Sequence, residues 1–322
     1  MHRDRRAALA AVAEMYHLDG LSMREIAERR HVSRSTVSRM LTQARERGVV
    51  EIAVHHSERR SSEVARTLEE QYGVHAEVVP VATGTSEVDR LEQVALRGAE
   101  HVRAVFGSDM TLVIPWGTTV AAVARHLIPR RTTGSRVVQL NGSGNTYSSG
   151  IAYASSIIDL FGAAFDASVH HFPVPAFFDD AATRRAMWRE RSVQRVLQMQ
   201  RHADVSLSSV GSLGSEVPGH LYRSGYLERA DVERLAEQGV VGDVGSIFLR
   251  SDGTTTGIDL NERSSGMPLP QLRRIPRRIL VATGHAKVPA VHAALLAHAV
   301  TDLIVDHDLA VELTGLRSSR RG

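Results

Sequence analysis

Cysteine is absent from the sequence, and so are long hydrophobic runs. Without cysteine, disulfide bonds, zinc centres held by thiolates and cysteine nucleophiles are all excluded. No apolar stretch approaches the ~20 residues that are needed to span a bilayer. The N-terminal run Met-His-Arg-Asp-Arg-Arg is not followed by the apolar core of a secretion signal. We therefore expect a cytoplasmic protein without a membrane segment.

Lysine is almost absent as well: Lys287 is the only lysine among the 39 basic residues. The net charge of +3 is small, but it is unevenly placed along the chain. Residues 1–60 carry 12 Arg and 8 acidic residues, whereas residues 61–322 carry the remaining 27 basic and 28 acidic residues. Nucleic acid is the natural partner of a basic N-terminal segment, although an ordinary solvated surface would give the same count.

Motifs of several catalytic and metal sites are missing too. There is no Gly-x-Ser-x-Gly elbow and no Walker phosphate loop, since Val288 follows Lys287. The 16 histidines include two adjacent pairs, at 55–56 and 170–171, but no His-x-x-x-His spacing. Adjacent side chains point apart on a regular element, so we expect no metal site. We recognise no paired acid and base among the loop carboxylates, so we expect neither an enzyme nor a cofactor.

Residues 21–41 have the pattern of two short helices joined by a tight turn. Their apolar positions recur at helical spacing and would meet in one small core: Ile26, Ala27, Val37, Met40 and Leu41. Ser33 precedes the second helix, where its hydroxyl can cap free backbone N–H groups. An amphipathic helix over residues 4–17 would complete a three-helix unit.

The outward face of the second helix carries short hydrogen-bonding side chains mixed with arginine. These residues are Arg34, Ser35, Thr36, Ser38, Arg39 and Gln43, and no carboxylate appears until Glu46. Such a face has the chemistry that is needed to enter a DNA major groove. We therefore predict a helix-turn-helix that binds double-stranded DNA. The alternative is a solvated helical hairpin without that function.

Four segments are expected along the chain. Residues 1–54 form the helix-turn-helix domain. Within this domain, Gly48 is expected to cap the end of the second helix of the motif, and a strand is possible over 49–54. The polar residues 55–62 form a linker. Residues 63–316 form an α/β domain, and 317–322 a disordered tail.

Residues 63–316 alternate between helical patterns and short β-branched strands, which is typical of a mostly parallel sheet with helices on both faces. We predict strands over 76–81, 110–114, 136–140, 163–169, 205–208, 242–249, 256–260, 278–281 and 302–305. We predict helices over 63–72, 87–105, 119–128, 148–160, 180–201, 229–238, 287–298 and 306–313.

Ligands of open α/β sheets bind beyond the carboxyl ends of the strands, so the loops there are the candidate site. The loop Pro115-Trp116-Gly117-Thr118-Thr119 offers hydroxyls and a helix N-terminus for a phosphate, although a Thr-capped turn would look the same. The loop 139–145, with Asn141, Gly142 and Ser143, offers groups that suit sugar hydroxyls. Asn-Gly also makes turns for local reasons.

Three further loops have the same position after a strand. They span residues 208–214, 241–245 and 284–287. The last of them places Lys287 at the head of a helix, where an ammonium group would partner an anion, although a lysine there is often only solvated.

These motifs, in this order, resemble the SorC family of bacterial sugar-responsive transcriptional regulators. The resemblance covers nearly the whole chain. It rests on the helix-turn-helix together with Trp116-Gly-Thr-Thr119, Val138-Gln-Leu-Asn-Gly142, Val210-Gly211, Gly242-Asp243 and Gly284-x-x-Lys287.

The resemblance implies a Rossmann-like effector domain of the sugar-phosphate isomerase and CoA-transferase group. It implies that sugars, often phosphorylated, are bound without turnover, and that the chain forms a homodimer or homotetramer. By the motif match, Gly117, Thr118, Thr119 and Lys287 would hold a phosphate. Asn141, Gly142, Gly211 and Asp243 would line the sugar, with Trp116 and Ser143 in the same loops.

The sequence departs from the family pattern at three positions. Pro115 stands where a small residue is common before Trp-Gly, so we expect a reshaped phosphate loop. His31 stands in the turn where glycine is common, which requires a backbone that tolerates a side chain. Asn141 stands where some members have lysine, so an imine to an aldehyde sugar cannot form at that position.

We therefore expect a regulator of a carbohydrate or polyol operon that binds a palindromic operator and responds to a sugar, polyol or sugar phosphate. Two other hypotheses remain at this point. One is a sugar-phosphate isomerase-like enzyme with an accessory N-terminal bundle. The other is a ligand-binding module that pairs with another protein through residues 1–54.

Overall fold

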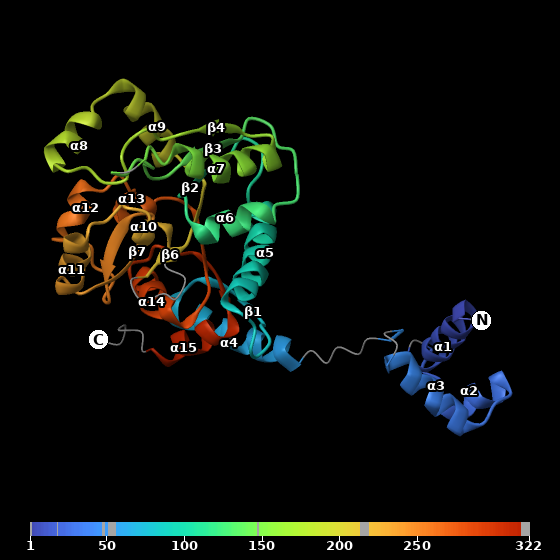
Figure 1. Ribbon diagram of the computed structural model, residues 1–322. Coiled ribbons are helices and arrows are strands. Elements are labelled where there is room, and N and C mark those ends of the chain that lie inside the picture. The colour runs from blue at the N-terminus through green and yellow to red at the C-terminus, as the bar shows by residue number, and fades with distance from the viewer. Residues whose placement is uncertain are drawn as a thin grey trace. The chain divides into compact units, whose positions relative to one another are not determined.

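A computed structural model describes residues 2–17, 19–46, 49–50, 56–146, 148–212 and 219–316 of the protein. The chain divides into two compact units, Met1–His56 and Ser57–Gly322. Each unit has a hydrophobic core of its own (Figure 1). Within the described residues, no helix is both long enough and apolar enough to cross a membrane.

The first unit is the predicted three-helix bundle. Its helices are α1 (His2–His17), α2 (Met23–Arg30) and α3 (Arg34–Glu46). Eight residues of the three helices are buried: Leu9, Val12, Ala13, Ile26, Ala27, Val37, Leu41 and Ala44. Ala44 was not predicted, and Met40, which helical spacing also assigns to the core, is half-buried against this cluster. The apolar pattern of the sequence thus determines both the helices and their core.

Side chains cap the amino ends of both α2 and α3. Ser22 caps α2, and its backbone N–H and hydroxyl both donate to Glu25, which completes a capping box. The Ser33 hydroxyl accepts a hydrogen bond from the Thr36 N–H at 3.1 Å, as predicted for the cap of α3. His31, which ends α2, is left-handed, with φ at 52°. The chain therefore places a side chain in a conformation that favours glycine.

The predicted linker over 55–62 is helical from residue 56 onwards, where helix α4 (His56–Tyr72) begins. Ser61 on α4 is buried and contacts the His307 ring, with 3.2 Å between Oγ and Nδ1, so one face of this polar segment packs within the second unit. Val49 and Val50 form a bend whose N–H groups bond to Ala44. The other predictions for this region, Gly48 and the strand residues 51–54, lie outside the described residues, as does the tail 317–322.

A seven-stranded sheet, in which every neighbouring pair is parallel, organises the second unit. Its strand order is β1-β10-β9-β5-β2-β3-β4. The strands are β1 (His75–Val79), β2 (Thr111–Ile114), β3 (Arg136–Gln139), β4 (Ser168–His170), β5 (Val205–Ser208), β9 (Arg277–Ala282) and β10 (Asp302–Asp306).

Helices cover both faces of this sheet, which confirms the predicted α/β class (Figure 1). One core cluster joins the sheet to α4, α9 (Arg191–Arg201), α14 (Val288–Leu296) and α15 (His307–Gly315). The other joins it to α5 (Glu87–Val105), α6 (Thr118–Arg125) and α7 (Ile151–Phe165). The shorter helices are α8 (Ala181–Met187), α10 (His220–Arg223), α11 (Arg229–Glu237), α12 (Asp259–Arg263), α13 (Leu269–Leu272) and the 3₁₀ turn η1 (His285–Lys287).

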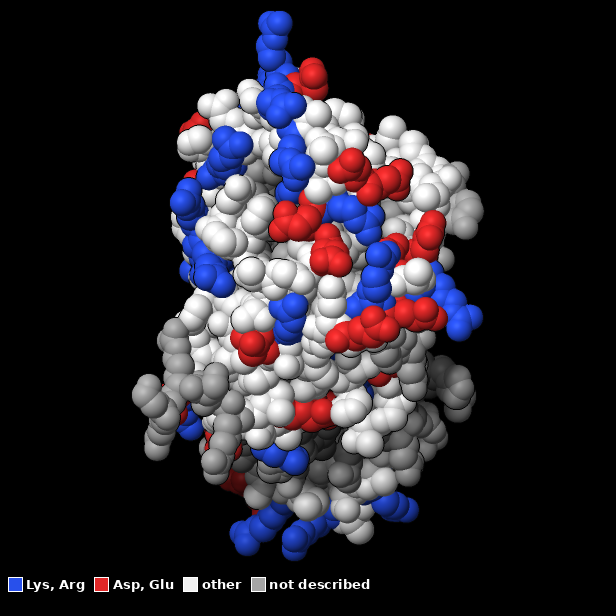
Figure 2. Space-filling model, turned by 90° about the vertical axis from the view of Figure 1, so that its left-hand side faces the viewer, with Lys and Arg blue, Asp and Glu red and all other residues white. Residues whose placement is uncertain are grey.

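Charge of both signs is spread over the surface (Figure 2). Basic side chains gather in the upper part of that view, and acidic side chains lie among basic ones across its middle. This face is therefore not covered by one sign of charge, in keeping with the near balance of 27 basic and 28 acidic residues after position 60.

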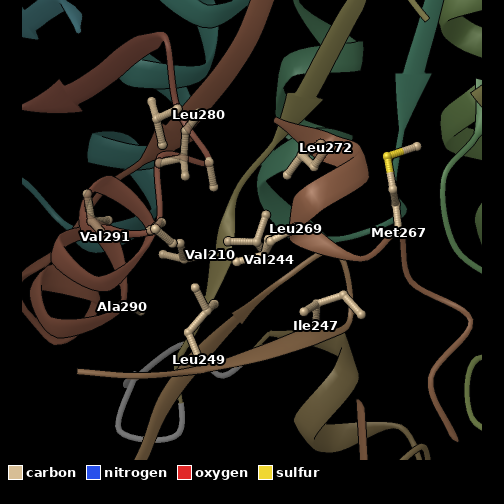
Figure 3. Packing of buried hydrophobic residues seen from close by; sticks show 14 of the residues in the cluster. Val210, Val244, Ile247, Leu249, Met267, Leu269, Leu272, Leu280, Ala290 and Val291 are labelled. Atoms are coloured by element: carbon tan, nitrogen blue, oxygen red, sulfur yellow. The ribbon is translucent and has the colours of Figure 1, made fainter. Parts of the chain in front are cut away.

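A small antiparallel sheet stands beside the main one. It consists of β6 (Val210–Gly211), β7 (Val240–Val244) and β8 (Ile247–Arg250). Apolar residues of these strands pack against α13, α14 and β9 in one cluster (Figure 3). Because β6 follows β5 after a single residue, this small sheet is fixed at the carboxyl edge of the main sheet.

Four predicted elements differ from the structure. The strand over 242–249 is two strands, because the chain turns after Val244 and β7 pairs antiparallel with β8. The strand over 163–169 is wrong at its start, because α7 continues to Phe165 and only 168–170 pair with β3. Asp166, left-handed with φ at 54°, ends that helix. The helix over 180–201 is two helices, since Trp188 ends α8 and packs its ring against Phe172 and Phe178.

The predicted strand over 256–260 is absent from the described structure, where α12 begins at Asp259 instead. The side chain of Asn261 explains the difference. Its amide accepts from the Phe248 N–H at 2.8 Å and donates to the Phe248 carbonyl at 2.9 Å. One amide side chain thus makes the two bonds with β8 that a paired strand would make.

Candidate functional site

The strand order creates a switch point between β2 and β5. From β2 the chain proceeds outward through β3 and β4, and from β5 it proceeds in the other direction through β9 and β10. The loops at the carboxyl ends of β2 and β5 therefore diverge, which leaves a crevice where open α/β sheets bind ligands. A pocket lies there, lined by residues 115–120 after β2 and 209–212 after β5.

Eight of the ten predicted effector residues line this pocket. They are Trp116, Gly117, Thr118, Thr119, Asn141, Gly211, Asp243 and Lys287. The other two, Gly142 and Ser143, are buried behind the lining. The Gly142 carbonyl accepts from the Trp116 indole N–H at 2.8 Å, and the Ser143 hydroxyl donates to the Ser149 carbonyl at 3.3 Å. Their contacts hold the wall of the pocket in place.

The amino end of α6 opens into the pocket. Gly117 caps the helix with φ at 154° and ψ at 162°, a conformation that is essentially restricted to glycine. No side chain caps the helix, and its first turn holds no acidic residue. The first N–H groups of a helix have no intrahelical partner and carry a partial positive charge. This end of α6 is therefore built to receive an anion.

Lys287 adds a full positive charge to the same end of the pocket. Its ammonium group donates to Thr119 Oγ1 at 3.2 Å, and so links the start of α14 to the start of α6. Burial lowers the pKa of Lys287 to about 8, while the carboxylates of Glu87, Asp243 and Asp306 oppose that shift. An anionic ligand would favour the charged form still further.

Asp243 lies on β7 and is 6% exposed. Its Oδ1 accepts from the Tyr222 hydroxyl at 2.8 Å, and its Oδ2 accepts from the Ser246 N–H at 2.9 Å. Burial raises the pKa of Asp243, and these two hydrogen bonds and Lys287 oppose the rise. Gly211 faces Asp243 across the small sheet, and a Cβ there would lie 2.0 Å from Asp243 Oδ1. The absence of a side chain at Gly211 therefore lets the carboxylate sit at the pocket.

Two buried polar atoms of the pocket lack a partner among the described residues. Asn141 is 1% exposed, and its amide donates to Ser246 Oγ at 2.7 Å, but its Oδ1 accepts no hydrogen bond. The hydroxyl of Thr283 is also unpartnered. An unsatisfied buried polar group costs about 1–3 kcal/mol, so a ligand that hydrogen-bonds to these atoms would be favoured.

Aromatic rings form another side of the pocket. Trp116 stacks on Tyr226 with 4.6 Å between ring centroids, and His220 stacks on Tyr153 at 3.9 Å. Burial lowers the pKa of His220, so its ring favours the neutral form. Flat faces of this kind suit the apolar face of a sugar ring.

Sequence reasoning missed several lining residues. They include Glu87, His220, Tyr222, Ser246 and Thr283. Glu87 begins a helix, and His220 and Tyr222 lie on the short helix α10, far along the chain from the motifs they join. No local pattern marks them. Ser246 and Thr283 are the exceptions. They lie close in sequence to the motif residues Asp243 and Gly284, so their place in the pocket could have been predicted.

The outward face of α3 is as predicted in its exposure. Arg34, Ser35, Ser38 and Arg39 are exposed, and Thr36 and Gln43 are half-buried. The hydroxyls of Ser35 and Thr36 each lie 2.8 Å from Ser33 Oγ. Arginine and hydroxyl side chains are thus presented together on one helix of the first unit.

Family comparisons divide the chain in nearly the same way as the structure. Residues 57–314 match the family model with the description "Putative sugar-binding domain". Residues 5–61 match the model of the MarR family.

Individual relatives cover almost the whole chain. The Deoxyribonucleoside regulator of Bacillus subtilis is 31% identical over 96% of this chain and 98% of its own length. The crystal structure of a domain of a possible sugar-binding transcriptional regulator from Arthrobacter aurescens TC1 is 45% identical, with a TM-score of 0.76, over 80% of this chain and 98% of that one. The full-length Sorbitol Operon Regulator SorC from Klebsiella pneumoniae shares the fold, with a TM-score of 0.71 and 21% identity over 97% of this chain and 99% of that one.

Proposed function

The chain belongs to the SorC family of sugar-binding transcriptional regulators, and from that premise we propose that its pocket binds a sugar phosphate reversibly, without turnover, to control binding of operator DNA. The observation that carries the proposal is the contact between Lys287 and Thr119 at the uncapped amino end of α6. The ammonium group of Lys287 and the partial positive charge at the amino end of α6 thus lie at the same end of the pocket.

The phosphate is assigned to Gly117, Thr118, Thr119 and Lys287. Backbone N–H groups at the helix start and the Thr hydroxyls donate hydrogen bonds to its oxygens, and the ammonium group balances its charge. Gly117 lets the backbone approach closely, because no Cβ covers the helix start.

The sugar is assigned to the other end of the pocket. Asp243 is a strong acceptor for hydroxyl groups, and the free Oδ1 of Asn141 is a second acceptor. Trp116 offers its ring as a platform, and Gly211 leaves room beside the carboxylate. Gly142 and Ser143 contribute through the wall that they support rather than by contact.

Binding is proposed to be non-covalent, because Asn141 has no amine with which to form an imine and the ammonium group of Lys287 is assigned to the phosphate. Incubation with an aldehyde sugar phosphate and borohydride should leave the mass of the protein unchanged. A stable adduct would contradict this part of the proposal.

A thermal-shift screen tests the effector. Pentose phosphates, hexose phosphates, free sugars, free polyols and inorganic phosphate are each added to the full chain, because a ligand of the folded state raises its stability by mass action. We expect phosphorylated sugars to raise the Tm more than the free compounds do. The double variant Thr119→Val, Lys287→Met should lose the shift and keep DNA binding. Thr67→Val, on α4, removes a half-buried hydroxyl that donates to the Glu63 carbonyl outside the pocket, and serves as a control.

The DNA-binding end is assigned to a dimer that presents two copies of α3 to a palindromic operator. Arg39, Ser35 and Thr36 would reach base edges, together with Ser38 and Gln43, while Arg34 would contact phosphates. The relatives are named as regulators rather than as enzymes. Incubation of the sugar phosphates with the pure protein should therefore return them unchanged.

A further inference from the structure

His75, Glu77 and His101 form a cluster on the edge of the main sheet. Among the described residues, one ligand atom from each of these three side chains lies within 4.8 Å of the others. His101 Nδ1 lies 2.7 Å and His75 Nε2 lies 3.8 Å from the same oxygen, Glu77 Oε1. Two ring nitrogens thus converge on one carboxylate oxygen.

A carboxylate also holds the second nitrogen of each histidine. His75 Nδ1 lies 3.1 Å from Glu69 Oε1, and His101 Nε2 lies 3.0 Å from Asp302 Oδ1. A hydrogen bond donated from that nitrogen orients each ring. On metal binding the proton between His101 Nδ1 and Glu77 Oε1 would be displaced, so that the lone pair of Nδ1 faces the ion. Histidines that bind metals are typically oriented in this way.

The cluster stands on regular elements. His75 and Glu77 are two residues apart on β1, so they share one face of the strand, and His101 reaches them from α5. The second oxygen of Glu77 lies 2.9 Å from Arg97 Nε, so that Oε1 is the oxygen that faces the two histidines. Such support keeps the three groups together without help from a loop.

From this geometry we propose that His75 Nε2, His101 Nδ1 and Glu77 Oε1 bind a divalent ion of the zinc class. Metal bonds of about 2.0–2.1 Å in a tetrahedron place ligand atoms about 3.3 Å apart, which small side-chain rotations would achieve here. Two imidazoles and one carboxylate suit zinc, with water as the fourth ligand.

The ion would be accessible and separate from the proposed effector site. The His75 side chain is 53% exposed, and Glu77 also lines a second cavity between α4, β1 and α5. None of the described residues that line the effector pocket belongs to this cluster. A bound ion would join β1 and, through Glu69, the end of α4 to α5. The proposal therefore stands whether or not the pocket binds a sugar phosphate.

The alternative occupant is a proton. A cationic His101 between Glu77 and Asp302 would make the same contacts as a purely structural ion pair. Direct measurement of bound metal separates the two cases.

The experiment uses the full chain without a histidine tag. The protein is stripped with EDTA, dialysed against ZnCl₂, passed through a desalting column and assayed for zinc by elemental analysis. We expect about one zinc per chain, with affinity lowered at least about tenfold in His75→Gln and in Glu77→Gln. Substitution with Co²⁺ should give the strong visible absorption of a four-coordinate ion. His126→Gln removes a histidine that pairs with Glu92 elsewhere, and should bind zinc like the wild type.

Two results would overturn the proposal. One is a wild-type protein that retains no zinc, which would leave the cluster as an ion pair only. The other is zinc retained equally by the wild type and His75→Gln, which would place the ion on other histidines. Because His75 is exposed, its variant should fold, and circular dichroism checks this independently of the metal.

Discussion

The ammonium group of Lys287 lies where burial opposes its charge. The pKa of about 8 means that near pH 7 the group is still mostly charged, although its surroundings favour the neutral form. A dianionic phosphate bound beside it would add to the counter-charge of Glu87, Asp243 and Asp306 and favour the charged form. The affinity for such a ligand should therefore depend on the protonation of this one residue.

We predict that effector affinity falls as the pH rises above about 8. Below that pH Lys287 is charged in the free protein, and above it each binding event must take up a proton. The loss should approach about tenfold per pH unit, as expected for linkage to one proton. Phosphate esters lose their second proton near pH ~6, so binding should be tightest between the two values. Calorimetric titration of the full chain from pH 6 to 10 measures this.

Lys287→Arg provides the matched control, because a guanidinium stays charged throughout this range. Its affinity should lack the decline above pH 8 even if the absolute value is lower. A wild-type affinity that stays constant from pH 7 to 9.5 would show that Lys287 does not face the effector.

The space beside Asp243 gives a second prediction at this scale. A Cβ on Gly211 would lie 2.0 Å from Asp243 Oδ1 and 2.8 Å from a Tyr222 ring carbon. Gly211→Ala should therefore displace the carboxylate, cost about 1–3 kcal/mol of unfolding free energy and weaken effector binding. Chemical denaturation and the thermal-shift response measure the two effects.

Gly219→Ala, at the same pocket, should cost little, because the nearest atom to its added Cβ is 3.8 Å away. Equal stability and equal effector response in the two variants would refute the crowding argument.

At the scale of elements, the local patterns of the sequence predict most of the fold. The bounds of α5 and β5 agree with the predicted ranges, because their apolar periodicity is regular. The failures occur where a tertiary contact decides. Asn261 satisfies β8 through its side chain, and Trp188 divides a helix by packing against two phenylalanines. Neither effect leaves a periodic trace in the sequence.

His31 gives a prediction for the turn between α2 and α3. A residue other than glycine in the left-handed conformation costs about 1–2 kcal/mol of folding free energy. Glycine removes this strain, but it also makes the unfolded chain more flexible, which cancels part of the gain. His31→Gly should therefore stabilise the first unit slightly, by under about 1 kcal/mol. His31→Val, with a branched Cβ in the same conformation, should destabilise it. Amide hydrogen exchange over residues 23–46 of the full chain should slow in the first variant and speed up in the second.

Arg39 tests the DNA-binding face of α3. If its guanidinium reads a base, Arg39→Ala should weaken operator binding by about 1–3 kcal/mol and affect non-specific DNA less. Arg24→Ala removes an equally exposed arginine from α2, where it pairs with Glu28, and should leave the preference for the operator unchanged. Equal loss on operator and random DNA would assign Arg39 to the phosphate backbone.

At the scale of the whole molecule, the site depends on topology that no local pattern contains. The motif residues could be predicted because their loops follow strands, and eight of them do line one pocket. Tyr222 and His220 could not be predicted. They lie on α10, which reaches the motif loops only through the switch in strand order between β2 and β5. The His75, Glu77 and His101 cluster is similar: its members are adjacent only because α5 crosses β1.

Two ligands on one chain imply a reciprocal effect. If effector changes operator affinity by a factor, operator must change effector affinity by the same factor. We predict a coupling of about 1–3 kcal/mol, or roughly 5–150-fold, in whichever direction the regulator works. Operator titrations at saturating and zero effector give one side of the cycle. Effector titrations at saturating and zero operator give the other.

The double variant Thr119→Val, Lys287→Met tests this coupling. It should bind operator with the affinity that the wild type has without effector, and effector should no longer change that affinity. Gln43→Ala, on α3, should instead weaken operator binding and leave effector affinity of the free protein intact. The two variants thus separate the ends of the cycle. If operator and effector titrations of the wild type gave unequal factors, the two ligands would not act on one shared equilibrium, and regulation would need a second effector site or a change of oligomeric state.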